Sequence, residues 1–217
     1  MIKTELGKID IIDLGISPYK NVWTMQKELQ QKRIDGKIDD TLILVEHEPV
    51  YTLGKNANKN HLLQNRDKSV EVYSIERGGD ITFHGPGQLV CYPILDLSNY
   101  KKSVSWYMST LEQVIIDTLG SFNISANRND GLTGVWVNDE KIAALGVRIS
   151  RWVTMHGFSL NVNPDLRFYD GIIPCGIFEH GITSMETILD QPINISQVKA
   201  TLIQNINDQF LKERANA

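Results

Sequence analysis

The chain has 217 residues, 41% of them hydrophobic and 22% charged, which is ordinary for a soluble globular protein. A net charge of -4 gives no basic field of the kind that binds nucleic acid, and no apolar run approaches the ~18 residues that predict a membrane helix. The N-terminus does not resemble a secretory signal, and two cysteines, Cys91 and Cys175, make no disulfide framework. We therefore expect a cytoplasmic protein with neither a nucleic-acid nor a membrane partner.

The N-terminal half predicts three strands and one helix. Residues 9–15 read as a strand that ends at a glycine. Residues 19–36 carry apolar residues near helical spacing, with Gly36 as the stop. The aliphatic run 41–47 predicts a buried strand, and the alternating run 70–76 predicts a half-buried one.

The next predicted strand, residues 88–97, contains Pro93, which indicates an edge position or a bulge. Residues 103–120 form the strongest predicted helix, with a serine cap and a terminal glycine. Three strand-like runs and a closing helix follow, at residues 133–139, 141–150, 156–162 and 194–217. Strands concentrated in the middle, with helices between and after them, favour an α+β fold over a regular βαβ series. Without a repeat or a linker, we expect a single domain over residues 1–217.

The glycine-rich stretch "RGGDITFHGPGQLVCY", residues 77–92, places conformational freedom beside reactive side chains. Clustered glycines indicate a backbone that turns tightly or approaches something closely. The spacing matches neither a dinucleotide-binding fingerprint nor a phosphate-binding P-loop, and the chain has no CxxC and no HExxH. The sequence therefore gives no support for a metal or a cofactor.

Cys175 follows Pro174 and precedes Gly176 in a loop-like segment. Most free cysteines are small buried apolar residues, and position alone favours that interpretation. A nucleophilic cysteine requires a loop, partial exposure and a nearby cation, and the loop is present. For Cys91, inside a predicted strand, the buried interpretation is preferred.

Lys141 opens the strand-like run "KIAALGVRIS", where a lysine is usually a solvated strand end. It could instead point into a pocket, stabilise a thiolate and carry a proton. His84 and His156 each precede a glycine, and the sequence leaves structural and functional roles open for both.

Taken in order, the segments "LVEHEPVYTLGK", "RGGDITFHGPGQLVCYPILDL", "TGVWV", "KIAALGVRIS", "HGFSLNV" and "PCGI" closely resemble the lipoyl (octanoyl) transferase family. The resemblance covers roughly residues 41–183. It implies the fold of the lipoate and biotin protein ligase catalytic domains, with a mixed sheet packed by helices. It also implies that Cys175 carries the acyl group and that Lys141 is its catalytic partner.

The same resemblance implies three substrate-binding segments. They are Arg77, Gly78, Gly79, Asp80, Ile81, Thr82, Phe83 and His84; Ala144, Leu145 and Gly146; and Gly157, Phe158 and Ser159. The glycines would let backbone walls come close around an apolar slot for an acyl chain. Arg77 and His84 would supply polar contacts around its carbonyl end or the carrier's phosphopantetheine.

The implied reaction is octanoyl transfer from octanoyl-acyl carrier protein to a specific lysine of a lipoyl domain, through a cysteine thioester and without a cofactor. The implied acceptors are 2-oxoacid dehydrogenase subunits and the glycine-cleavage H protein. Two alternatives share the fold, namely an ATP-dependent lipoate-protein ligase and a non-catalytic acyl-carrier-binding module. Because both implied partners are typically acidic, we also expect a local basic patch near the pocket mouth, with Arg148 and Arg151 as candidates.

Overall fold

The structure is a computed structural model that describes residues 2–6, 9–173 and 180–215, with side chains described for residues 9–173 and 180–211. Within these ranges, nine strands form one sheet in the order β1-β2-β3-β7-β11-β10-β9-β8, and β12 pairs with β10. The strands are β1 (Ile2–Leu6), β2 (Ile9–Ser17), β3 (Asp40–His47), β7 (Gln88–Ile94), β8 (Asn127–Asn129), β9 (Leu132–Val137), β10 (Glu140–Ser150), β11 (Val153–Asn161) and β12 (Gly181–Ile182). The pairs β2–β3 and β10–β12 are parallel and the others antiparallel, so the predicted mixed sheet is confirmed.

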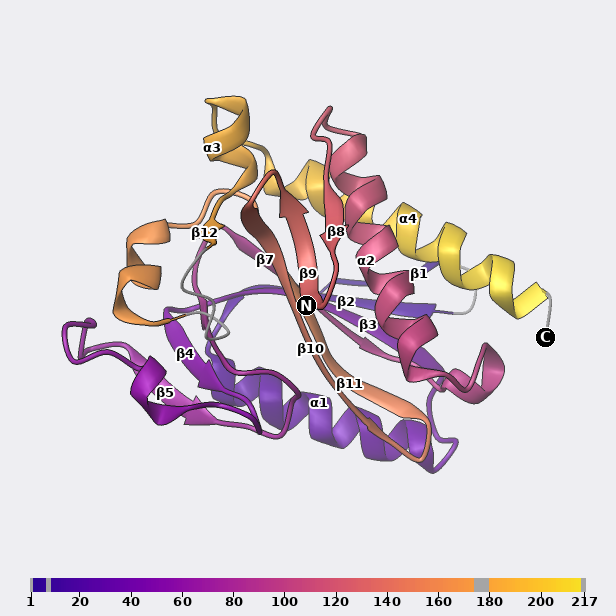
Figure 1. Ribbon diagram of the computed structural model, residues 1–217. Coiled ribbons are helices and arrows are strands. Elements are labelled where there is room, and N and C mark those ends of the chain that lie inside the picture. The colour runs from indigo at the N-terminus through magenta and orange to yellow at the C-terminus, as the bar shows by residue number, and fades with distance from the viewer. Residues whose placement is uncertain (1, 7–8, 174–179, 216–217) are drawn as a thin grey trace.

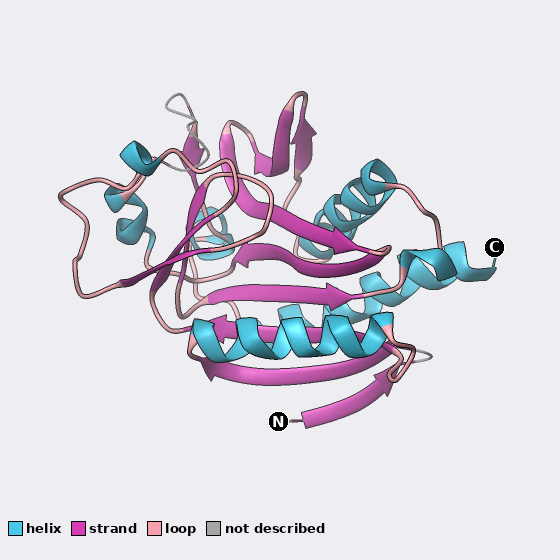
Figure 2. Ribbon diagram, turned by 90° about the horizontal axis from the view of Figure 1, so that it is seen from below, coloured by secondary structure: helices cyan, strands magenta, loops and turns pink. Residues whose placement is uncertain are grey.

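Helices cover both faces of this sheet (Figure 1). Helices α2 (Val104–Gly120) and α4 (Ile195–Ala215) pack on one face, over a core that includes Leu44, Leu89 and Cys91. Helix α1 (Tyr19–Ile34) packs on the other face over Val90 and Tyr92, and Figure 2 shows it running alongside the strands. The alternation of side chains along β7 therefore assigns Cys91 to one layer and its two neighbours to the other.

A second sheet has three strands among the described residues, in the order β5-β4-β6: β4 (Val50–Leu53), β5 (Glu71–Ser74) and β6 (Ile81–His84). Short helical segments complete the chain: η1 (Lys59–His61), η2 (Leu97–Asn99), η3 (Leu166–Gly171) and α3 (Met185–Leu189). The sequence interpretation did not separate β4 and β6 as strands. Each has only four residues, and the glycines on either side of β6 masked its alternation.

Pro93 does not mark an edge strand, because β7 lies between β3 and β11 in the middle of the large sheet. Proline has no N–H to donate, and the β7–β11 ladder accordingly ends at Cys91, opposite Phe158. Beyond Cys91, the side chain of Thr154 supplies hydrogen bonds to β7 in place of the ladder. Its Oγ1 donates to the Pro93 carbonyl at 2.6 Å and accepts from the Leu95 N–H at 2.9 Å. The edge interpretation is therefore wrong, and the irregularity lies inside the sheet.

The buried side of α1 carries two glutamines that serve this irregular stretch of β11. Gln30 donates from Nε2 to the Val153 carbonyl at 2.9 Å, and Gln26 accepts the His156 N–H at 3.0 Å through Oε1. Both glutamines are buried. Buried backbone groups that lack a ladder partner must be satisfied by other means, and here a helix supplies the partners.

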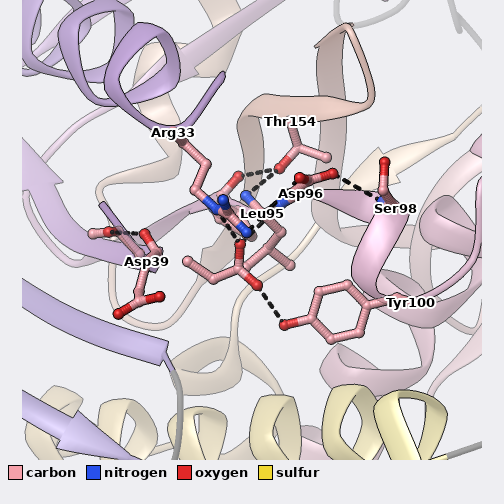
Figure 3. Close-up of polar contacts among 10 residues, drawn as sticks. Arg33, Asp39, Leu95, Asp96, Ser98, Tyr100 and Thr154 are labelled. Carbon is pink, nitrogen blue, oxygen red and sulfur yellow. Dashed lines mark hydrogen bonds and ion pairs between the residues drawn. The ribbon is translucent and has the colours of Figure 1, made fainter. Parts of the chain in front are cut away.

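A buried carboxylate joins the C-terminal end of α1 to the sheet, and Figure 3 labels its partners Arg33, Asp96 and Tyr100. Asp40 accepts from Arg33 Nε at 2.7 Å, from the Asp96 N–H at 2.9 Å and from the Tyr100 hydroxyl at 2.7 Å. Its side chain is 1% exposed, and the Arg33 side chain is 12% exposed. One carboxylate thus links α1, β3 and the chain that follows β7.

Replacing this carboxylate should destabilise the protein strongly. Asp40→Ala would leave the Arg33 guanidinium and the Tyr100 hydroxyl without their acceptor, and breaking a buried pair costs about 3–5 kcal/mol. Equilibrium urea unfolding measures the loss. Asp35→Ala, which removes the partner of exposed Lys37, is the matched control and should change stability little. Equal losses in the two variants would contradict this account of Asp40.

Candidate active site

The glycine-rich stretch forms one wall of a cavity on the α1 side of the sheet. Residues 77–80 lead into β6, residues 85–87 turn the chain, and β7 returns through the centre of the large sheet. At Gly87, which has φ +83°, an added Cβ would lie 2.3 Å from the Asn163 carbonyl oxygen. The turn is therefore pressed against the chain after β11 and admits no side chain at this position.

The cavity brings the three predicted substrate-binding segments together. The space between its walls, counted together with the open mouth, is about 460 Å³. Its wall includes every predicted substrate-binding residue except Gly78 and Phe83, together with four further residues: Tyr19, Val90, Tyr92 and His156. Strand register explains why residues 144–146 and 157–159 lie side by side, because Ala144 pairs with Ser159 and Gly146 with Gly157 across β10 and β11.

Gly78 and Phe83 lie elsewhere. Gly78 borders an open groove along β10, and its N–H donates to the Val147 carbonyl at 3.0 Å. Phe83 points to the opposite side of β6, where its ring stacks on Phe168 at 4.6 Å. Strand alternation accounts for this, since Thr82 and His84 on either side of Phe83 face the cavity.

Arg77 lines the cavity, and backbone carbonyls hold its guanidinium in place. Nη2 donates to the Thr52 carbonyl at 2.8 Å and to its hydroxyl at 3.0 Å, while Nη1 donates to the Gly78 carbonyl at 2.9 Å. The residue is 8% exposed. A buried cation with these partners shapes the loop and gives the cavity a fixed positive charge.

A buried chain of hydrogen bonds runs from His84 to the strand beside Lys141. Gln88 accepts from His84 Nδ1 at 2.6 Å and donates from Nε2 to Asn161 Oδ1 at 2.9 Å. Asn161 donates in turn to the Thr183 carbonyl at 2.9 Å. Because the Gln88 amide nitrogen already donates to Asn161, its oxygen is the acceptor for His84, and neutral His84 carries its proton on Nδ1. Its Nε2 is consequently an acceptor.

Lys141 is buried, at 5% exposure, and does not sit at a solvated strand end. It pairs with Trp136 on β9 and with Ile182 on β12, and its Nζ lies 4.8 Å from the Trp136 ring centroid. The Thr183 N–H donates to the Lys141 carbonyl at 3.0 Å. A small cavity joins Lys141 to Thr82 and Ala144, which also line the main cavity.

Cys175, the predicted nucleophile, lies outside the described residues. The chain on either side of it is described: the Ile173 N–H donates to the His61 carbonyl at 2.8 Å, and Ile182 pairs with Lys141. Cys91 is 0% exposed and burial raises the pKa of its thiol. Cys91 belongs to the hydrophobic core beneath α2 and α4, in agreement with its predicted structural role.

Three histidines near the cavity are kept neutral. Burial lowers the pKa of His84 to about 3, with a further contribution from the nearby His47. Burial, assisted by the positive charge of Arg77, lowers the pKa of His156 to about 3, and burial alone lowers that of His47 to about 4. His47 Nε2 lies 2.8 Å from the Tyr92 hydroxyl and its Nδ1 lies 3.1 Å from the Ser17 carbonyl, so the Tyr92 hydroxyl is the donor to neutral His47.

The lowered pKa values of these three histidines predict that the folded protein loses stability in mild acid. The unfolded chain protonates them near pH 6.5, whereas the folded protein resists protonation until about pH 4 or 3, so falling pH favours the unfolded state. Each contributes up to about 1.4 kcal/mol per pH unit in this window. Urea unfolding from neutral pH to about pH 5 should show the decline, and His84→Asn should flatten it. An identical slope in the variant would contradict the assignment.

The candidate basic residues Arg148 and Arg151 do not line the cavity. Arg148 Nη1 lies 3.5 Å from Glu76 Oε1, and Arg151, with φ +49°, sits in the tight turn between β10 and β11. The predicted basic patch stays a prediction. Among the described residues, no group of three potential metal-ligating side chains is arranged to hold an ion. No helix in the described ranges is long and apolar enough to cross a membrane.

Sequence reasoning did not single out four residues that surround the site, namely Tyr19, Gln88, Tyr92 and Asn161. Alternation along residues 88–92 offered a signal for two of them, since Gln88, Val90 and Tyr92 share one face of β7. Asn161 and Tyr19 carried no local signal, because their place at the site depends on contacts with strands that are distant in the sequence.

The family described as "Lipoyl protein ligase A/B catalytic domain" matches residues 18–207. The chain belongs to this family. It is 50% identical over 173 residues to the octanoyltransferase of Gloeobacter violaceus, covering 79% of this chain and 78% of that one. It is 43% identical to the octanoyltransferase of Cytophaga hutchinsonii, covering 97% and 96% of the two chains.

Solved structures confirm the predicted fold. A putative lipoate protein ligase from T. acidophilum matches with a TM-score of 0.72 at 13% identity, over 92% of this chain and 84% of that one. The biotin protein ligase of Aquifex aeolicus matches with a TM-score of 0.57 at 13% identity, over 98% and 73%. At such identities the likeness establishes the architecture, while function must be argued from the site.

Proposed function

We propose that this protein is an octanoyltransferase that moves an octanoyl group from acyl carrier protein to a specific lysine of a lipoyl domain. The observation that carries the proposal is the extended similarity to octanoyltransferases, at 43% identity over nearly the whole chain and 50% over a shorter span. The cavity supports it, because narrow walls built partly from glycine suit an unbranched acyl chain. Residues 1–217 would form one catalytic domain, acting in the cytoplasm.

In the first half of the reaction, the Cys175 thiolate attacks the carbonyl carbon of the octanoyl thioester. The C–S bond to the carrier breaks, the carrier leaves as a thiol after taking up a proton, and a new thioester forms on Cys175. The buried ammonium of Lys141 supports this step by favouring the thiolate. The support for pairing the two residues is the register that joins Lys141 to Ile182, seven residues after Cys175.

In the second half, the acceptor lysine attacks the acyl-enzyme as a free amine. An amide bond forms, the C–S bond to Cys175 breaks, and the nitrogen loses a proton. Lys141 is the proposed acceptor of this proton, because it gave its own proton to the departing carrier thiolate in the first half. The oxygen of the tetrahedral intermediate needs hydrogen-bond donors near Cys175. The acceptors would be 2-oxoacid dehydrogenase subunits or the glycine-cleavage H protein.

The acyl-enzyme makes a direct test. Incubation with octanoyl-acyl carrier protein should add one octanoyl mass to the intact protein, and hydroxylamine should remove it. Peptide mapping should place it on Cys175 and not on Cys91, which is buried and serves as an internal control. Cys175→Ala should abolish the adduct, and an adduct of equal yield on this variant would refute the assignment of Cys175 as the nucleophile.

Two Lys141 variants separate charge from proton transfer. Lys141→Ala should slow acylation at neutral pH and shift its rate profile to higher pH, because a free cysteine is only a few per cent thiolate at neutrality. Lys141→Arg keeps the charge and should acylate faster than Lys141→Ala, yet transfer poorly to the acceptor because arginine holds its proton.

The main alternative is an ATP-dependent lipoate ligase, which the fold also serves. A thioester already holds the free energy to form an amide, so transfer from octanoyl-acyl carrier protein should proceed with ATP absent and a chelator present. Free octanoate with ATP and magnesium should give no modified lipoyl domain, as measured by its intact mass. Efficient modification from the free acid would assign the protein to the ligases instead.

A further inference from the structure

The cavity has a reactive end and a far end. Thr82 and Ala144 line both the main cavity and the small cavity at Lys141, so they mark the end near the proposed chemistry. From Ala144 the walls continue along β10 through Leu145 to Gly146. Opposite them, β11 runs from Ser159 back to His156, which pairs with Val147.

The distance between the two ends suits a medium-length chain. Val147 lies three residue steps along the strand from Ala144, and a strand rises about 3.3 Å per residue, which gives about 10 Å. This is the length scale of an extended medium-chain acyl group. Glycines stand opposite each other in the middle of this stretch, at positions 146 and 157, so neither position adds a side chain to the passage.

His156 occupies the far end in a conformation that histidine rarely adopts. Its φ is +60°, its side chain is 1% exposed, and its N–H is fixed by Gln26 Oε1 at 3.0 Å. The ring meets Tyr92 edge-on, with centroids 6.4 Å apart. Within the described chain, its Nε2 is buried without a hydrogen-bond partner. Glycine would fit this backbone without strain, so the retained ring points to a use for its bulk.

Aromatic residues pack around His156 at this end. The Tyr92 hydroxyl is 2.8 Å from His47 Nε2, and the Tyr19 ring stacks on His84 with centroids 6.1 Å apart. Tyr19 and His156 are both tied to α1, the first as its initial residue and the second through Gln26. An aromatic wall of this kind can contact a terminal methyl group, and a longer acyl chain would run into it.

We propose that the imidazole of His156 is the end wall of the acyl slot and sets the upper limit of acyl chain length. The inference rests on the octanoyl transfer proposed above and deepens it by naming a residue that determines specificity. Removing the ring should lengthen the slot without touching Cys175 or Lys141. Replacing it with a ring of similar size should keep the limit.

The experiment measures binding separately from transfer. Calorimetry gives the affinities of straight-chain saturated acids with eight, ten and twelve carbons for wild type, His156→Gly, His156→Asn and His156→Phe. Glycine and asparagine both tolerate a positive φ, so the result does not depend on one variant folding. Asn123→Gly relieves a similar positive φ, +60°, at the exposed end of α2 and is the matched control. Transfer from the corresponding acyl-carrier proteins is assayed in parallel.

The ratio of twelve-carbon to eight-carbon affinity should rise about tenfold or more in the glycine and asparagine variants, since a single excess methylene in a tight pocket already discriminates about tenfold or more. It should stay at the wild-type value in His156→Phe and Asn123→Gly. Unchanged ratios in both smaller variants, or an equal rise in His156→Phe, would overturn the inference, as would wild-type protein that binds none of the acids. Normal chain-length discrimination in binding without any octanoyl transfer would instead overturn the proposed function alone.

Discussion

The close approach of β11 to β7 at Gly157 is the constraint on which the site depends. A Cβ at this position would lie 2.2 Å from the Cys91 carbonyl oxygen and 2.7 Å from Pro93 Cδ, so only glycine is accommodated. Pro93 ends the ladder at the same place because it has no N–H to donate. At the adjacent residue, His156, the backbone enters the left-handed region. Both Gly157 and His156 line the cavity, so the cavity lies where the β7–β11 ladder stops.

Opening a sheet at its centre leaves backbone groups without ladder partners, and neighbouring elements supply them. Gln26 and Gln30 of α1 satisfy the His156 N–H and the Val153 carbonyl, and Thr154 bridges to β7. The Asp40 carboxylate then fixes the end of α1 relative to β3 and β7. A helix with a polar buried face is unusual for a core element, but it suits a sheet that needs hydrogen-bond donors and acceptors at one point.

The cavity walls combine buried polar groups with a nearly fixed charge distribution. The guanidinium of Arg77 is retained by backbone carbonyls, while the histidines around it are neutral because burial and its positive charge disfavour protonation. The hydrogen-bonded series from His84 through Gln88 and Asn161 to Thr183 couples the cavity wall to the strand beside Lys141. Wall and proposed catalytic group are thus positioned by one network, which a change at any member would disturb.

Local sequence predicted the long elements. The periodicity of residues 103–120 and the aliphatic run 41–47 predicted α2 and β3, because such patterns require only near neighbours. Motif resemblance placed Lys141 and the cavity segments, although the lysine alone looked like a solvated strand end. Tertiary structure decided the rest. Pro93 lies inside the sheet because β7 pairs with β3 on one side and with β11 on the other. Phe83 packs on Phe168, away from the cavity that its neighbours line. Asn161 has its hydrogen-bond partners in residues 88 and 183, which are distant in the sequence. These outcomes depend on strand register between segments far apart in the chain, which no local pattern encodes.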